Sequence, residues 1–283
     1  MRALLIAALL LPATATAGAW TKKLGEHYVR VGADTYRAGA VVDPATGDEI
    51  PASFVGRSYS LYGEVGILPP WPLQLSLYVP LSVGTSHFED PAFVGERGTA
   101  TVTRAGDLRV TLQAAILHEG PQLAVSVEGK IPMYANGNIG GAFGNLRPWF
   151  PLPGDGQVDL TPMVRAGGSI PKTPLFAQGA VGFRVRTPWF VGWQTNTRFA
   201  HGVPFEASLG GRLGPLLLIG QFDGIVNVQR DDVTREGIQL GVTALLDVWK
   251  GLAFEARFAG EPWTRNAAQG VTFGLGVSWR MPS

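Results

Sequence analysis

Apolar and polar residues alternate along much of the chain, and the closing stretch shows this pattern most regularly. In GVTFGLGVSW the residues at 271, 273, 275, 277 and 279 are apolar, whereas those between them are small or polar. Successive side chains of a β-strand point to opposite faces, so the alternation predicts a strand with one apolar face. The same period of two recurs at 73–83, 108–116 and 123–131.

Alternation by itself fits either a soluble sandwich or a membrane barrel, and the connections distinguish the two. The short links are 69–72, 119–121, 171–174, 214–215 and 248–251. The longer polar or glycine-rich segments are 38–53, 84–105, 133–157, 187–203, 229–236 and 260–269. Short turns that alternate with long loops are typical of outer-membrane barrels, in which the turns lie on the periplasmic side.

We therefore expect an all-β fold, a transmembrane antiparallel up-and-down β-barrel of about twelve strands. The expected strands are 27–38, 54–67, 73–84, 106–118, 122–132, 158–170, 175–186, 204–213, 216–228, 237–247, 252–260 and 270–280. The segment 189–199 also resembles a strand. Because bacterial single-chain barrels have even strand numbers, we place 189–200 in an extracellular loop, with fourteen strands as the alternative.

The start of the chain resembles a secretory signal. Arg2 precedes the apolar run 3–11, and Ala15-Thr16-Ala17 has the small residues of a cleavage site. We expect residues 1–17 to be removed and residues 18–283 to form one outer-membrane barrel domain. The chain has no cysteine, which excludes a disulfide scaffold and a lipoprotein anchor.

The remaining composition also favours a barrel. The 38 glycines and 21 prolines leave few windows for a long helix, and a closed barrel is the other structure that satisfies its backbone in a membrane. The 23 Lys and Arg nearly balance the 22 Asp and Glu, so we expect no nucleic-acid partner. Trp71, Trp249 and Trp279 lie at the expected periplasmic ends of strands, where interfacial aromatics belong. We conclude that the apolar face of 271–279 meets the outer-membrane lipid of a Gram-negative bacterium.

The middle of the chain resembles the family named for the MetA pathway of phenol degradation. The resemblance rests on Gly106-Asp107-Leu108, on Lys130-Ile131-Pro132, and on Gly154-Asp155-Gly156-Gln157 with Asp159. These motifs are structural, not catalytic. The resemblance implies an outer-membrane transporter loosely akin to the fatty-acid and aromatic-hydrocarbon channels.

Two further expectations concern gating and assembly. Only about ten residues separate the expected cleavage site from the first strand, which we judge too few for an N-terminal plug, so a gate must come from loops. The aromatic Trp279 near the end of the last strand is the kind of signal that the barrel-assembly machinery recognises, although Arg280 to Ser283 follow it. We expect a monomer.

Polar residues opposite the lipid face are the candidates for lining the lumen. They are Glu64, Gln74, Tyr78, Arg109, Gln113, Glu128, Lys130, Asp159, Arg165, Arg184, Gln221, Asp223, Gln239, Glu255 and Arg257. They predict a narrow conduit of mixed charge. The alternative is a set of paired charges that closes the lumen.

Apolar residues in the expected extracellular segments are candidates for a constriction that captures a small apolar solute. They are Phe143, Trp149, Phe150 and Leu152, with Trp189, Phe190 and Trp193. The alternative is that these side chains pack within the loops or in the outer interfacial belt.

No motif in the sequence predicts a catalytic, cofactor or metal site. The four histidines, His27, His87, His118 and His201, have no nucleophile pattern around them, and we expect no cofactor and no metal. We predict passive passage of small, apolar or aromatic molecules through a lumen restricted by loops. An outer-membrane enzyme that modifies lipids or peptides, and a closed structural or adhesion barrel, are the alternatives.

Overall fold

A computed structural model describes residues 19–42, 49–68, 72–89, 97–117, 120–134, 156–190, 199–229, 234–265 and 268–281. Within these residues no helix is long and apolar enough to cross a membrane. The strands are β1 (His27–Val42), β2 (Glu49–Leu68), β3 (Leu73–Glu89), β4 (Arg97–Ala105), β5 (Asp107–Leu117), β6 (Gln122–Pro132), β7 (Gln157–Ser169), β8 (Leu175–Gly182), β9 (Val185–Phe190), β10 (Gly202–Leu213), β11 (Leu216–Asn227), β12 (Glu236–Trp249), β13 (Leu252–Arg265) and β14 (Ala268–Met281).

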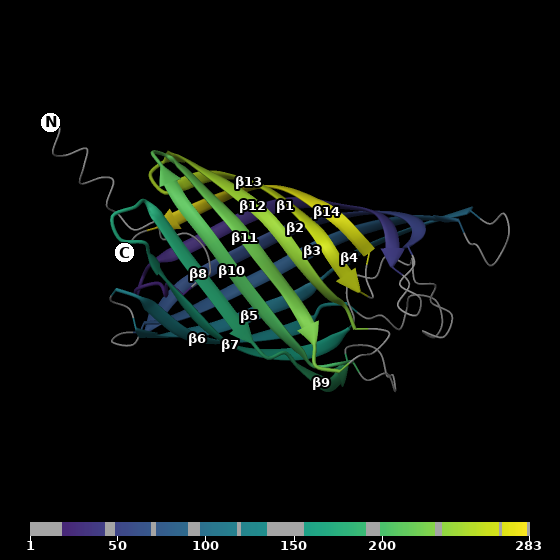
Figure 1. Cartoon of the computed structure of the whole chain (residues 1–283), viewed down its shortest axis with the longest axis horizontal. Helices are drawn as coiled ribbons and strands as arrows, with labels where there is room; N and C mark the ends of the chain where they lie inside the picture. The colour runs from purple at the N-terminus through teal and green to yellow at the C-terminus, as the bar shows by residue number, and fades with distance from the viewer. Residues whose placement is uncertain are drawn as a thin grey trace.

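Twelve of these strands close into an antiparallel barrel (Figure 1). Neighbours pair in the order β1, β2, β3, β5, β6, β7, β8, β10, β11, β12, β13 and β14, and β14 pairs back to β1 along its whole length. The prediction of an all-β barrel of twelve strands is confirmed. The alternative of a barrel with fourteen strands is wrong, because β4 and β9 add no new position to the ring.

The two additional strands arise where a proline interrupts the ladder. β4 and β5 both pair with β3 and are separated at Gly106, which lies beside Pro80; a side chain there would approach the Pro80 ring to 2.8 Å. β8 and β9 both pair with β7 and are separated at Phe183, beside Pro162. A proline has no N–H to give to the ladder, so each long strand is divided into two.

The long connections differ from the prediction. β1 and β2 continue to Val42 and Glu49, β3 and β4 fill most of 84–105, and β13 and β14 leave only two residues between Arg265 and Ala268. The first three strands have 16, 20 and 17 residues, more than the 9–11 that cross a bilayer. Most of 38–53, 84–105 and 260–269 is therefore hairpin that extends past one end of the barrel (Figure 1).

The opposite end of the barrel carries the short turns, the start of β1 and the end of β14 (Figure 1). Gly214 and Gly251 occupy these turns with φ values of 61° and 88°, a conformation that other residues rarely adopt. The described short links thus agree with the prediction. We call this end the turn end and the other the hairpin end.

The two faces of β14 differ as its alternation predicts. Phe273 and Leu275 are each 55% exposed on the outer face of the barrel, while Gly274 and Gly276 face inward. The outer surface repeats this pattern on every side, with exposed Leu, Val and Phe on all twelve strands of the ring. Exposed tryptophans stand near both ends, at Trp249 and Trp279 and at Trp189 and Trp263. An apolar band with aromatic margins is the surface typical of a transmembrane barrel.

Candidate functional site in the barrel lumen

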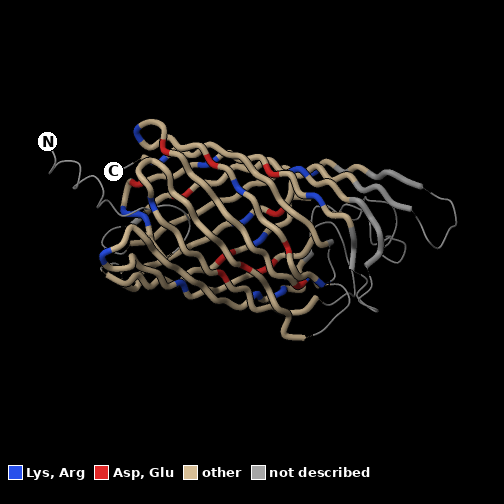
Figure 2. The backbone as a smooth tube through the Cα atoms, turned by 45° about the horizontal axis from the view of Figure 1, so that its top comes forward, with Lys and Arg blue, Asp and Glu red and all other residues tan. Residues whose placement is uncertain are grey.

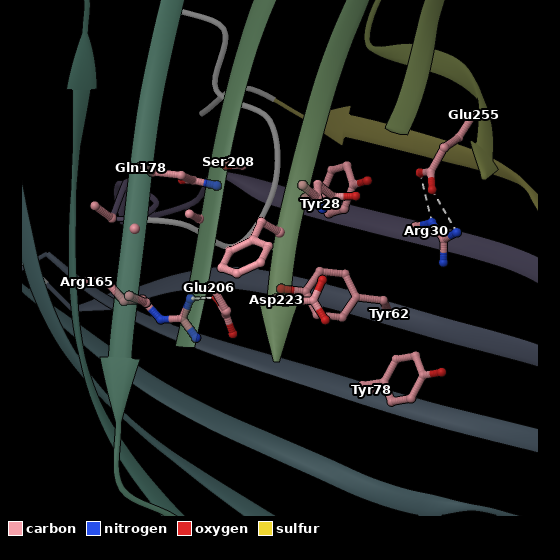
Figure 3. Close-up of a pocket in the computed structure, with 16 residues that line it drawn as sticks. Tyr28, Arg30, Tyr62, Tyr78, Arg165, Gln178, Glu206, Ser208, Asp223 and Glu255 are labelled. Atoms are coloured by element: carbon pink, nitrogen blue, oxygen red, sulfur yellow. Dashed lines mark hydrogen bonds and ion pairs between the residues drawn. The ribbon is translucent and has the colours of Figure 1, made fainter. Parts of the chain in front are cut away.

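The barrel encloses a cavity of about 380 Å³ between facing walls. Tyr28, Tyr62 and Tyr78 line it from β1, β2 and β3, and Arg165 and Glu206 line it from β7 and β10 (Figure 3). Because these strands lie on different sides of the ring, the cavity belongs to the lumen and not to a surface groove. Charges of both signs are spread along the strands (Figure 2).

The charged residues of the wall are mostly paired. Arg30 on β1 reaches across β14 to Glu255 on β13, with its Nε and Nη2 atoms each 2.8 Å from a carboxylate oxygen (Figure 3). A Cβ at Gly276 of β14 would lie 3.4 Å from Arg30 Nε, and one at Gly274 only 2.0 Å from Asp34 Oδ1. The glycines of the last strand therefore leave the room that these side chains occupy inside the barrel.

Similar pairs bridge other parts of the wall. Arg165 on β7 reaches past β8 to Glu206 on β10 at 2.7 Å. Arg257 donates to Gln239 Oε1 at 2.7 Å. Arg165–Glu206, like Arg30–Glu255, joins strands that are not direct neighbours, whereas Arg257 and Gln239 lie on the paired strands β13 and β12. Each contact satisfies a charge that the protein interior would otherwise disfavour.

The motifs that resemble the MetA-pathway family converge on one network. Lys130 Nζ lies 2.9 Å from Asp159 and 3.8 Å from Asp107, so it bridges β5, β6 and β7. Arg186 Nη1 lies 3.1 Å from Asp159. The Tyr134 hydroxyl donates to Asp107 at 2.8 Å and accepts from the Gly156 N–H at 3.1 Å. The motifs thus have a structural role, because they fasten three strands near the hairpin end.

All fifteen residues predicted to line the lumen lie in the described part of the chain. Those that are buried are Glu64, Gln74, Gln113, Lys130, Asp159, Arg165 and Glu255. Those that are partly exposed are Tyr78, Glu128, Arg184, Gln221, Asp223, Gln239 and Arg257, and Arg109 is exposed and lies 3.7 Å from Glu128. The cavity described above brings together Tyr78, Arg165, Gln221, Asp223 and Glu255.

An N-terminal segment, residues 19–26, lies inside the turn end of the lumen, contrary to the expectation that so short a stretch could not plug it. Its Lys22 ammonium lies 3.5 Å from Glu64 and 5.6 Å from the centre of the Tyr28 ring. The Lys22 N–H donates to the Gln74 side chain at 2.9 Å.

The same segment fills an apolar patch on the other side of the lumen. Phe176, Leu217, Ile219 and Leu245 form this patch, and Trp20 packs against it, edge to face with Phe176 at 5.5 Å between ring centres. Ala19, which is 1% exposed, lines the cavity itself. The prediction of lumen-lining residues did not include this patch, because that prediction selected polar residues and the inward residues of the patch are apolar.

Most residues of the predicted constriction cannot be placed. Phe143, Trp149, Phe150, Leu152 and Trp193 lie outside the described residues. Trp189 and Phe190 are the last residues of β9. Phe190 pairs with Gln157 of β7, and the Trp189 side chain is 65% exposed. The constriction stays a prediction.

Sequence reasoning missed several residues that line the cavity, namely Tyr28, Arg30, Tyr62, Gln178, Glu206 and Ser208. For the first two a signal was present, because Val29 and Val31 point outward, 39% and 60% exposed, and alternation then places Tyr28 and Arg30 inside. For Glu206 and Ser208 the same signal was present, because the apolar residues Val203, Phe205, Ala207 and Leu209 alternate with them.

The residues that the structure describes give no support to a metal site or to a catalytic site built on a histidine. No group of three or more His, Asp or Glu there is arranged to hold a metal ion. His201 Nδ1 accepts the Arg186 main-chain N–H at 3.0 Å, which is a structural contact.

No family model matches the chain, and no curated protein matches its sequence. Solved structures share its fold. The COG4313 outer membrane channel from Pseudomonas putida F1 is similar with a TM-score of 0.68 and 12% identity, over 94% of this chain and 100% of that one. For the NanC porin the TM-score is 0.53 and the identity 9%, over 90% and 100%. For the translocator domain of autotransporter NalP from Neisseria meningitidis they are 0.50 and 10%, over 95% and 91%.

These similarities concern the fold, because the identities are low. They agree with the coarser expectation of an outer-membrane type of barrel. The resemblance of the sequence motifs to the MetA-pathway family stays a prediction.

Proposed function

We propose that this protein is an outer-membrane channel through which small molecules diffuse passively. The observation that carries the proposal is the polar cavity between facing walls of a closed barrel, because a barrel whose core were filled by side chains alone would leave no such space. The apolar outer band supports placement in a membrane. The similarity in fold to a protein described as an outer membrane channel supports the same role.

The lining of the cavity suggests the kind of solute. Three tyrosines face paired charges, so the walls offer aromatic surface and hydrogen-bonding groups but little net charge. We propose small, uncharged or weakly charged molecules, including aromatic ones, as the solutes. The direction of transport follows the concentration gradient, since the proposal involves no source of energy.

Planar-bilayer recording with refolded protein tests the proposal. Discrete conductance steps, reduced by one class among phenol, benzoate and small aliphatic solutes, are the expected result. Heat-modifiable gel mobility shows that the barrel is folded. A folded barrel that never conducts, with or without residues 19–24, would contradict the channel.

In that case the wall pairs favour the closed structural barrel. The charges of the lumen would then serve to hold the strands together, as Arg30 and Glu255 do. The contact between His201 and the Arg186 main chain gives no support to a lipid-modifying enzyme.

A further inference from the structure

The N-terminal segment, residues 19–26, spans the lumen from wall to wall. Lys22 is held by Gln74 of β3, and Trp20 lies against the patch that includes Leu217 and Ile219 of β11. In the ring of twelve strands β3 and β11 stand six places apart, so they are diametrically opposite. The segment therefore runs across the turn end from β3 to the patch on β8, β11 and β12, where it narrows the path through the barrel.

The segment is fastened differently at its two ends. Near β1 it is tied by main-chain bonds, since Gly25 N–H donates to Gly66 O at 3.4 Å and Gly66 N–H donates to Glu26 O at 3.2 Å. Residues 19–23 belong to no strand and are held by wall side chains. Lys22 pairs with Glu64 and Trp20 packs on Phe176, while Gln74 accepts from the Lys22 main-chain N–H and Gln113 donates to the Thr21 hydroxyl at 3.2 Å. Gly25 has a φ of 81°, so a flexible residue separates the two parts.

We propose that residues 19–24 form a displaceable plug, which closes the turn end of the lumen and opens by swinging about Gly25. The inference rests on the proposed channel function. Docking uses the ion pair of Lys22 with Glu64 and the packing of Trp20 on Phe176. Release removes the Lys22 charge from the lumen and uncovers the Glu64 carboxylate, so the open channel favours cations more than the closed one.

A disulfide provides the most direct test, because the chain has no cysteine of its own. A Cβ at Gly167 of β7 would lie 3.4 Å from the Cβ of Ala19, close to the separation that a disulfide requires. In the double variant Ala19→Cys with Gly167→Cys, oxidation ties the far end of the plug to the wall. We expect the oxidised protein to conduct about tenfold less often than the reduced protein, a change of about 1.4 kcal/mol in the opening equilibrium.

Deletion of residues 19–24 should have the opposite effect and raise both the open probability and the preference for cations in a salt gradient. Lys22→Met together with Trp20→Ala should reproduce the higher open probability while keeping the length of the segment. Lys23→Met is the matched control, since its exposed side chain makes no ion pair within the described residues, and it should behave as the unchanged protein.

The outcomes separate this inference from the channel itself. Equal conductance of the oxidised and reduced double variant, with the disulfide confirmed on a non-reducing gel, would overturn the plug and leave the channel intact. The single variants Ala19→Cys and Gly167→Cys should not respond to oxidation, and equal responses from them would also overturn it. Silence of every folded variant, the deletion included, would instead reject the channel.

Discussion

The middle of the lumen and its turn end are held together in different ways. In the middle, Arg30 and Glu255 belong to wall strands whose main chains are already fixed by the ladder, so their pair adds to a rigid frame. At the turn end, Lys22 and Trp20 belong to a segment outside the ladder, and side-chain contacts with the wall hold its residues 19–23 in place. Contacts of similar chemistry therefore stabilise the barrel in one region and only position a segment in the other.

The largest effect should come from breaking a wall pair. Arg30→Met leaves Glu255 buried without its partner, and we expect the free energy of unfolding to fall by about 3 kcal/mol. Urea unfolding in lipid vesicles, followed by tryptophan fluorescence, measures the change. In the double variant with Glu255→Met most of the loss should be recovered, because no unpaired charge remains. A single variant as stable as the unchanged protein would contradict the role of the pair.

A smaller effect should follow from filling the space beneath the wall charges. Gly274→Ala places a Cβ 2.0 Å from Asp34 Oδ1, so that side chain must move, and we expect a loss of about 1–2 kcal/mol in the free energy of unfolding. The control is Gly63→Ala on β2, where the nearest atom would be 3.8 Å away. Equal stability of the two variants would show that the inward glycines of β14 do not serve to make this room.

The smallest effect on stability should come from the turn end. Trp20→Ala frees the plug without opening a void in the wall, so the free energy of unfolding should change by no more than about 1 kcal/mol. The same variant should raise the open probability in bilayers. A large loss of stability in Trp20→Ala would mean that the segment is part of the frame.

The sequence predicts the strands well because each has one face on the outer surface. The alternation of β14 and β3 follows from that single contrast, and it gives the inward face of each strand, whereas the strand number also required the spacing of the links and the rule of even strand numbers. The hairpin extensions were not predicted, because residues such as those at 84–89 extend beyond the apolar band, where the contrast between the faces disappears. The divisions at Pro80 and Pro162 depend on which residue lies opposite each proline, which no local pattern contains.

The lumen was predicted only in part for a related reason. Alternation selects inward residues, yet it cannot show that Arg30 crosses β14 to reach Glu255, because the partner is 225 positions away. The plug, residues 19–24, shows no periodic alternation of apolar and polar residues. Its position depends on an ion pair and on an apolar patch assembled from β8, β11 and β12, so only the closed barrel brings its contacts together.

The pairing of β1 with β14 has a consequence for the order of assembly. It joins residues 27–41 to residues 268–281, the longest separation along the chain of any strand pair in the barrel. Contacts between distant parts of a chain cost the most loop entropy and tend to form late. Because Glu26 directly precedes β1, the last strand pair to close also carries the N-terminus to its place. A newly inserted molecule would then close its barrel and place the plug in the turn end of its lumen in the same event.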